Sequence, residues 1–472
     1  MLLALALVVI AAPAPAHAQG SVQASAPQNS QENAQQKKYV FAHYMVCCPR
    51  GLIDEAGVLS GDPPVESYLE EIKEAARAGI DGFALNVGAW TTQPHYRTNS
   101  AKLFEAAKRF GDSFKLFFSA DGVSADETAD MIATYGDHPN QFRYDGRPVL
   151  STFGSSADWI REVRAKVRAR SAHEIYAVPF FFPPTMHTIP TADDVNALVA
   201  DSADIDGYFY FGAAESPDKL DRAIRLYGEG WTRSNKLFMA GIAPYYRGLR
   251  VNYRVFDNGG YDGLVKQWTS AIANHAQWVE LVTWNDWGES TYFAPLAPDS
   301  PSTRWTAEWG HLLSHDGFLN ANRYFIDWFK GGKPPAIDRE RLFYTYRPHY
   351  RFATGTPDPA KPAKGMPKGV RALKNQIYFL AFLQQPAELI VRTQATVQRV
   401  QLPAGMSQAS ARLFRGQIDM ELRRNGERIA SKTGEFAVSP TDAWSNFNML
   451  AGEMVFAAQS ARGAGQDRPG TP

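Results

Sequence analysis

The stretch Tyr39–Val87 contains YVFAHYMVC (39–47), then VESYLEEIKEAARA (65–78), then GFALNV (82–87). The first and last segments are short and almost continuously apolar, as expected for strands that are buried on both faces. The middle segment has apolar residues at helical spacing and ends at Gly79, a residue that favours a helix C-terminus. A strand, a helix and a strand in this order predict a parallel sheet covered by helices.

The same alternation continues for another two hundred residues or so, about the length that such a fold needs. Helical stretches such as 100–110, 158–170 and 218–227 separate further apolar runs. These runs predict six more strands, at 115–120, 148–153, 175–182, 207–211, 237–242 and 279–284. Eight strand–helix units are typical of a (β/α)8 TIM barrel, predicted here over residues 38–350. An open doubly wound sheet is the alternative, but no Gly-rich phosphate loop follows the first strand.

The character of the sequence changes after this region. The predicted linker, 351–369, contains the Pro-, Gly- and Lys-rich run GTPDPAKPAKGMPKG (355–369). Strand-like segments follow, and Asn425–Gly426 between two of them indicates a hairpin. Residues 370–457 therefore predict a small C-terminal β-sandwich domain, and the polar residues 458–472 a disordered tail.

The N-terminal residues predict export. Leu2–Ala12 is an apolar run too short to span a bilayer, and Ala16-His17-Ala18 has the small-x-small pattern of a cleavage site. We therefore interpret residues 1–18 as a signal peptide, although no Lys or Arg precedes the apolar run. Residues 19–37 predict a flexible leader. A secreted or periplasmic protein, with no membrane attachment after signal removal, is the expectation.

Composition limits the partners that the chain can have. Lys plus Arg and Asp plus Glu both number 49, and this balance argues against a nucleic-acid partner, which needs a basic surface. The two cysteines, Cys47 and Cys48, are adjacent; a vicinal disulfide is one interpretation, but two buried thiols at a strand end are favoured. No zinc-ligand spacing occurs, so we expect no metal and no cofactor. We expect the chain to be a monomer.

The run Trp284–Ser290 (WNDWGES) contains the candidate catalytic residues. It ends the eighth predicted strand, and active sites of (β/α)8 barrels lie at the carboxyl ends of their strands. Asp286 and Glu289 would supply the acid and the carboxylate that glycoside hydrolysis requires. We favour Glu289 as the acid and Asp286 as the base, although the sequence leaves these roles open. The alternative is a capping turn with exposed acids and packed tryptophans.

Several other side chains are candidates for contacting substrate. Trp284 and Trp287 would form the apolar wall of a sugar subsite, and Asn285 would bond a hydroxyl. The candidates at other strand ends are His43, Tyr44, Asn86, Asp121, Tyr245 and Tyr246. A core histidine and a simple Asp-Gly turn are the alternatives for His43 and Asp121. Asp81 begins its strand, which is the end of a barrel associated with stability, so a salt bridge or cap is its default role.

Four segments occur in the order and spacing of a known family: VFAHYMV, GIDGFALNVG, KLFFSADG and WNDWGEST. Together with YFIDWFKGGKPPAIDRERLFYTYRPH, they resemble glycoside hydrolase family 71, the α-1,3-glucanases or mutanases, over about residues 39–350. The resemblance implies an inverting endo-hydrolase of α-1,3-glucan without a metal. It places the acidic pair on Asp286 and Glu289, and a further acid on Asp81.

The sequence departs from the fungal pattern of this family at two points. Trp287 replaces a tyrosine, and Cys47–Cys48 replaces glycine and polar residues. Two alternatives therefore stay open. One is a glycosidase of another specificity, such as an endo-α-mannosidase of the family 99 type; the other is a non-catalytic carbohydrate-binding protein.

Overall fold

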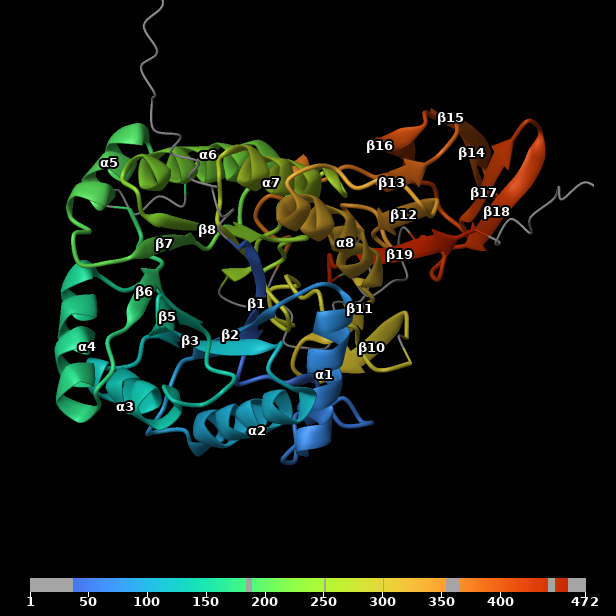
Figure 1. Ribbon diagram of the computed structural model, residues 1–472. Helices are drawn as coiled ribbons and strands as arrows, with labels where there is room; N and C mark the ends of the chain where they lie inside the picture. The colour runs from blue at the N-terminus through green and yellow to red at the C-terminus, as the bar shows by residue number, and fades with distance from the viewer. Residues whose placement is uncertain are drawn as a thin grey trace, which may run out of the picture. The chain divides into compact units, whose positions relative to one another are not determined.

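The structure is a computed structural model that describes residues 37–183, 189–249, 252–299, 301–353, 365–439 and 446–456 (Figure 1). The predicted signal peptide, the leader up to residue 36, most of the predicted linker and the predicted tail lie outside these residues. No helix within the described ranges has the length and apolarity needed to cross a bilayer.

The larger part of the chain is a mixed α/β fold built on a curled parallel sheet. Its strands follow the order β6-β5-β3-β2-β1-β9-β8-β7, and every neighbouring pair is parallel. The strands are β1 (Tyr39–Met45), β2 (Gly82–Val87), β3 (Lys115–Asp121), β5 (Arg147–Phe153), β6 (Tyr176–Pro179), β7 (Gly207–Tyr210), β8 (Leu237–Ile242) and β9 (Trp278–Leu281). The prediction of a parallel sheet is confirmed. A short strand, β4 (Arg143–Tyr144), pairs antiparallel with β5.

Helices surround the sheet on its outer side (Figure 1). They are α1 (Val65–Arg77), α2 (Pro94–Phe110), α3 (Ala125–Tyr135), α4 (Ala157–Arg170), α5 (Ala192–Ala200), α6 (Pro217–Arg233), α7 (Asp262–Ala273) and α8 (Asp316–Gly331). Local sequence explains where they begin and which face they bury. Helix α3 starts at a capping box between Ser124 and Glu127, and α1 buries Tyr68, Ile72 and Ala75 at helical spacing.

The sheet is filled with aromatic side chains near the amino ends of its strands. The Phe41 ring lies 4.9 Å from the Phe117 ring and 5.8 Å from the Trp278 ring. Phe142 adds a further ring 5.2 Å from Trp278. The interior of the sheet is therefore packed at the amino ends of its strands.

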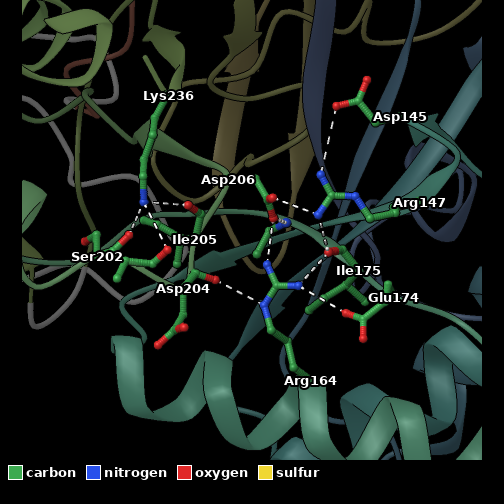
Figure 2. A network of polar contacts seen from close by, with 12 residues as sticks. Asp145, Arg147, Arg164, Glu174, Ile175, Ser202, Asp204, Ile205, Asp206 and Lys236 are labelled. Atoms are coloured by element: carbon green, nitrogen blue, oxygen red, sulfur yellow. Dashed lines mark hydrogen bonds and ion pairs between the residues drawn. The ribbon is translucent and has the colours of Figure 1, made fainter. Parts of the chain in front are cut away.

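Strands β6 and β7 lie at the two edges of the sheet, and no ladder joins them within the described chain. An ion-pair network connects them instead (Figure 2). Asp206, which directly precedes β7, binds Arg147 at 2.8 Å and Arg164 at 2.6 Å through its two carboxylate oxygens. It also accepts a hydrogen bond from the Ala177 N–H of β6, while its own N–H donates to the Ala177 carbonyl. Asp206 therefore holds the two edges together at their amino ends.

The C-terminal part contains two four-stranded antiparallel sheets, ordered β16-β13-β12-β19 and β15-β14-β17-β18. The strands are β12 (Arg341–Tyr346), β13 (Gln376–Leu383), β14 (Ala387–Thr393), β15 (Thr396–Leu402), β16 (Gly405–Arg412), β17 (Asp419–Arg424), β18 (Glu427–Thr433) and β19 (Leu450–Val455). Side chains from both sheets share one apolar core. The predicted hairpin is confirmed: Asn425 and Gly426, both with positive φ, join β17 to β18.

Candidate active site

The turn after β9 is fixed to the end of β1. Asn285 accepts a hydrogen bond from the Met45 N–H at 2.7 Å. Its amide nitrogen donates to the carbonyls of Met45 (3.1 Å) and Cys48 (3.0 Å), and the Trp287 indole donates to the same Cys48 carbonyl at 2.9 Å. All these bonds are buried from solvent or nearly so. The position of the acidic turn is therefore set by the backbone of the neighbouring strand.

The two predicted acids lie on this turn and are joined through its backbone. Asp286 accepts a hydrogen bond from the Glu289 N–H at 2.9 Å, and its own N–H donates to the Thr283 hydroxyl. Glu289 accepts a hydrogen bond from the Tyr246 hydroxyl at 2.6 Å and one from the Asn252 amide at 3.3 Å. Each carboxyl therefore has fixed partners and a defined direction.

The environment raises the pKa of both acids. Enclosure by protein atoms is the main cause for Asp286, followed by the charge of Glu289, and together they raise its pKa to about 7. Enclosure also raises the pKa of Glu289, against the lowering effects of the Tyr246 hydrogen bond and the Arg254 charge. Since the two carboxyls repel each other when both are ionised, the pair keeps one proton as the pH approaches neutral.

Glu289 lies on the wall of a cavity of about 590 Å³. The cavity is formed mainly at the carboxyl ends of β5, β6 and β7 and by the segment after β8. Its apolar lining is Phe153, Phe180, Phe182 and Phe211, and its polar groups are Tyr246, Arg254, Glu215 and Glu289. An apolar pocket with a few polar groups that converge on it is typical of a small-molecule or sugar site. The described residues contain no group of three or more metal-ligating acids, histidines or cysteines placed to hold a metal.

Three of the other predicted residues lie at the carboxyl ends of inner strands. His43 pairs with Glu280 at 2.6 Å, and its ring lies 5.1 Å from the ring of Phe211, which lines the cavity. Asn86 donates to the Asp121 carboxylate at 3.2 Å, so β2 and β3 bring these two side chains together.

Five other predicted residues use their polar atoms in hydrogen bonds within the protein. The Tyr44 hydroxyl and the Trp284 indole both donate to Glu71 of α1, at 3.2 Å and 2.9 Å. Asn285 and Trp287 bind the backbone of the neighbouring segment, as described above. The Tyr245 hydroxyl donates to the Phe447 carbonyl in the C-terminal part. The structure therefore separates Tyr245 from Tyr246, although the two are adjacent in sequence.

Asp81 lies at the opposite end of the sheet from the acidic turn. Its carboxylate accepts a hydrogen bond from the Val40 N–H at 2.8 Å and binds Lys330 at 2.6 Å. These contacts join the amino ends of β1 and β2 to α8.

Cys47 and Cys48 form a disulfide. The favoured interpretation, two buried thiols, is wrong, and both residues are partly exposed. The reason is local: the Cys48 N–H donates to the Met45 carbonyl, which turns the chain directly after β1 and brings the two sulfurs together.

The sequence did not identify Glu215 or Arg254 as site residues. Glu215 follows β7, and Arg254 lies in the long segment after β8. Their positions after the carboxyl ends of strands are the sequence feature that could have suggested a role in the site. Neither is part of a recognisable motif, and both contact the cavity only because the loops fold back over it.

Asn285→Ala is expected to lower the thermal stability and kcat together. It removes three hydrogen bonds and leaves the Met45 N–H without its acceptor, a cost of about 2–3 kcal/mol. Thermal unfolding and steady-state kinetics would measure both effects. Asn274→Ala, at the end of α7, is the control; a normal kcat in Asn285→Ala would contradict the positioning role.

Several known proteins are similar to this chain over most of its length. A family model described as glycosyl hydrolase family 71 matches residues 36–463. A mutanase of Penicillium rubens is 27% identical over 431 residues, which are 88% of each chain. A glucan endo-1,3-alpha-glucosidase of Schizosaccharomyces pombe is 29% identical over 420 residues, covering 83% of this chain and 91% of the relative. Among solved structures, the family 99 endo-alpha-mannosidase of Bacteroides thetaiotaomicron aligns with a TM-score of 0.48 and 15% identity, over 63% of this chain and 99% of the other.

Proposed function

The chain belongs to glycosyl hydrolase family 71, and from this premise we propose that it is an endo-acting hydrolase of α-1,3-glucan. The carboxyl pair Asp286 and Glu289 carries the proposal. The pair follows β9 and keeps one proton near neutral pH, and Glu289 borders an aromatic cavity. The names of the two curated relatives support the α-1,3 linkage.

The proposed reaction is a single displacement. Glu289 donates a proton to the glycosidic oxygen while the bond from this oxygen to the anomeric carbon breaks. Asp286 takes a proton from a water molecule whose oxygen attacks the same carbon from the opposite face. The Tyr246 and Asn252 hydrogen bonds fix the direction of the Glu289 carboxyl, which lines the cavity. The product has inverted anomeric configuration.

Reducing-sugar release from insoluble α-1,3-glucan by the purified chain tests the activity, and NMR of the first-formed product tests the inversion. Release of β-configured reducing ends is the expected result. If only an α-mannan or another α-glucan is hydrolysed, the chain is still a glycoside hydrolase, but its substrate is not α-1,3-glucan. Binding without turnover on every glycan would favour a carbohydrate-binding protein, and α-configured products would reject inversion.

Activity is expected to fall as the pH rises above about 7. The one-proton state of the pair is the active state: the two coupled carboxyls share this proton, which lies on Glu289 when the reaction begins, and it leaves the pair near the raised pKa of about 7. A pH profile of kcat/KM between pH 4 and 9 would measure this limb. A loss of activity that begins near pH 4.5, where ordinary carboxyl groups lose their proton, would contradict the assignment of the active state to the one-proton pair.

We infer the roles of the remaining site residues from their positions. We assign substrate contacts to His43, Asn86 and Asp121, together with Tyr246 and the cavity residues. Tyr44, Trp284, Asn285, Trp287 and Tyr245 support the site through the hydrogen bonds given above. Asp81 is structural in this proposal, because it lies at the amino ends of the strands.

The finer architecture belongs to the same proposal. Strands β6 and β7, linked through Asp206, complete a (β/α)8 barrel, and the two antiparallel sheets form a β-sandwich domain. Because β12 pairs with β13 and β19, this domain takes residues 341–346 in addition to those after the linker. The proposal includes export of a monomeric protein to the periplasm or the medium, where its polysaccharide occurs.

A further inference from the structure

Three large apolar side chains are exposed close together on one face. Val58 is 44% exposed, Leu59 38% and Trp305 39%. Val58 and Leu59 belong to the segment between β1 and α1. Trp305 belongs to β10 (Thr303–Thr306), which pairs with β11 (Gly310–Leu313) in a hairpin between β9 and α8.

Direct contacts join these two segments. The Ala307 N–H donates to the Gly57 carbonyl at 2.8 Å, and Arg304 donates to the carbonyls of Ile53 and Asp54. The Trp305 ring packs on Gly57, where an added Cβ would lie 2.7 Å from a ring carbon. The three exposed side chains therefore form one surface, which we term the Trp305 platform.

The platform lies at the same end of the sheet as the acidic turn. Its two segments follow the carboxyl ends of β1 and β9, which are neighbouring parallel strands. The hairpin that carries Trp305 also carries Trp309, whose ring centroid lies 6.5 Å from that of Trp287. The Trp309 indole is also 3.5 Å from where a Cβ of Gly288 would stand, between the two acids in sequence.

The cavity lies on the other side of the turn. It is lined by residues that follow β5 to β8, whereas the platform is formed by the segments after β1 and β9. The acidic turn therefore borders the cavity through Glu289, and Trp309 brings it close to the hairpin that carries Trp305. A chain that is cleaved at an internal bond needs a binding surface on both sides of that bond.

We propose that the Trp305 platform binds the polysaccharide chain beyond the cleaved bond. This rests on the proposed function and names a second binding surface for the same substrate. The apolar face of a sugar ring stacks on an exposed indole, and Val58 and Leu59 widen the surface to more than one ring. A glucan suits this platform better than a protein does, because three side chains fall far short of a stable protein interface.

Trp305→Ala tests the proposal. Turnover of insoluble α-1,3-glucan and retention of the protein on it are expected to fall roughly 5- to 10-fold, the loss of one stacking contact. Turnover of a soluble α-1,3-linked oligosaccharide that spans the acids but is too short to reach the Trp305 platform should stay within about twofold of the parent. Trp305→Phe keeps a ring and should recover most of the binding. Phe352→Ala, at an aromatic residue that is 50% exposed after β12, is the control and should change neither substrate.

Two outcomes would overturn the proposal. One is equal retention of the parent and Trp305→Ala on the insoluble glucan; the other is an equal loss on both substrates, because that marks a change in the fold or in the acids. If the parent releases no sugar, the proposed function fails by itself. Retention on the insoluble glucan then still decides whether the Trp305 platform binds it.

Discussion

Asp286→Asn and Glu289→Gln are each expected to lower kcat on α-1,3-glucan by roughly 10³-fold or more, with a much smaller change in KM. A positioned acid or base contributes about 10²–10⁴ to the rate, and a second carboxyl cannot replace it. Both substitutions keep the shape of the side chain, so the cavity stays intact. Reducing-sugar kinetics at a fixed pH would measure the two constants.

The two variants should differ on a substrate with a good leaving group. An aryl α-glucoside needs little protonation when its bond breaks, so Glu289→Gln should retain much of the parent activity on it if Glu289 is the acid. Asp286→Asn should stay inactive on both substrates, because the water still needs a base. The reverse pattern would exchange the two roles. Asp218→Asn, an amide substitution at the exposed start of α6, is the matched control.

Stability separates loss of chemistry from loss of fold. The pKa of Asp286 is about 7 in the folded chain and about 4 in an unfolded chain. The folded state therefore binds this proton more tightly, and its stability falls as the pH rises from 4 to 7. Asp286→Asn removes this penalty, so its thermal midpoint at pH 8 should equal or exceed that of the parent. An inactive variant with a lower midpoint would argue for a damaged fold.

The strands could be predicted from the sequence because they are buried on both faces and form short apolar runs between helical segments. GFALNV and LFMAGI are strands β2 and β8 from their first residue to their last. The end of α1 followed a local signal as well, because Gly79, which has a positive φ, comes directly after its C-terminal cap. The position of the acidic turn followed from the order of the strands alone.

The direction of side chains could not be predicted in the same way. His43 and Tyr44 are adjacent on a strand, so one faces the inside of the sheet and the other faces α1. A continuously apolar strand gives no alternation to show which is which. Trp284 resembles a sugar-binding residue in sequence, but Glu71, more than two hundred residues earlier, binds its indole.

The pairing of strands that are distant in the sequence could not be predicted either. Arg341–Tyr346 follows α8 in the sequence and lies within the region predicted to form the barrel, residues 38–350. It forms a central strand of a C-terminal sheet because β13 and β19 pair with it on both sides. Such pairings depend on strands that are distant in the chain, and the local pattern of apolar and polar residues does not show which strands will pair.

Asp206→Ala is expected to have the largest effect on stability, about 2–4 kcal/mol, or roughly 2–4 °C in the thermal midpoint of a chain of this length. It removes the shared partner of Arg147 and Arg164 and leaves the Ala177 N–H without an acceptor (Figure 2). The carboxylate is slightly exposed, which places the effect below that of a fully buried pair. No ladder joins β6 and β7 in the described chain, so little else compensates at this position.

Thermal unfolding of Asp206→Ala beside Asp204→Ala tests this argument, because Asp204 is a neighbouring, more exposed carboxylate that binds Arg161 instead. The control should lose less than about 1 kcal/mol. Below the unfolding transition, kcat of Asp206→Ala should match the parent, since the network lies at the amino ends of the strands and the acids at the carboxyl ends. Equal midpoints for the two variants would mean that the edges of the sheet are held by packing and that the ion pairs add little. A fall in kcat of the folded protein would mean that closure at one end of the sheet controls the geometry of the acids at the other.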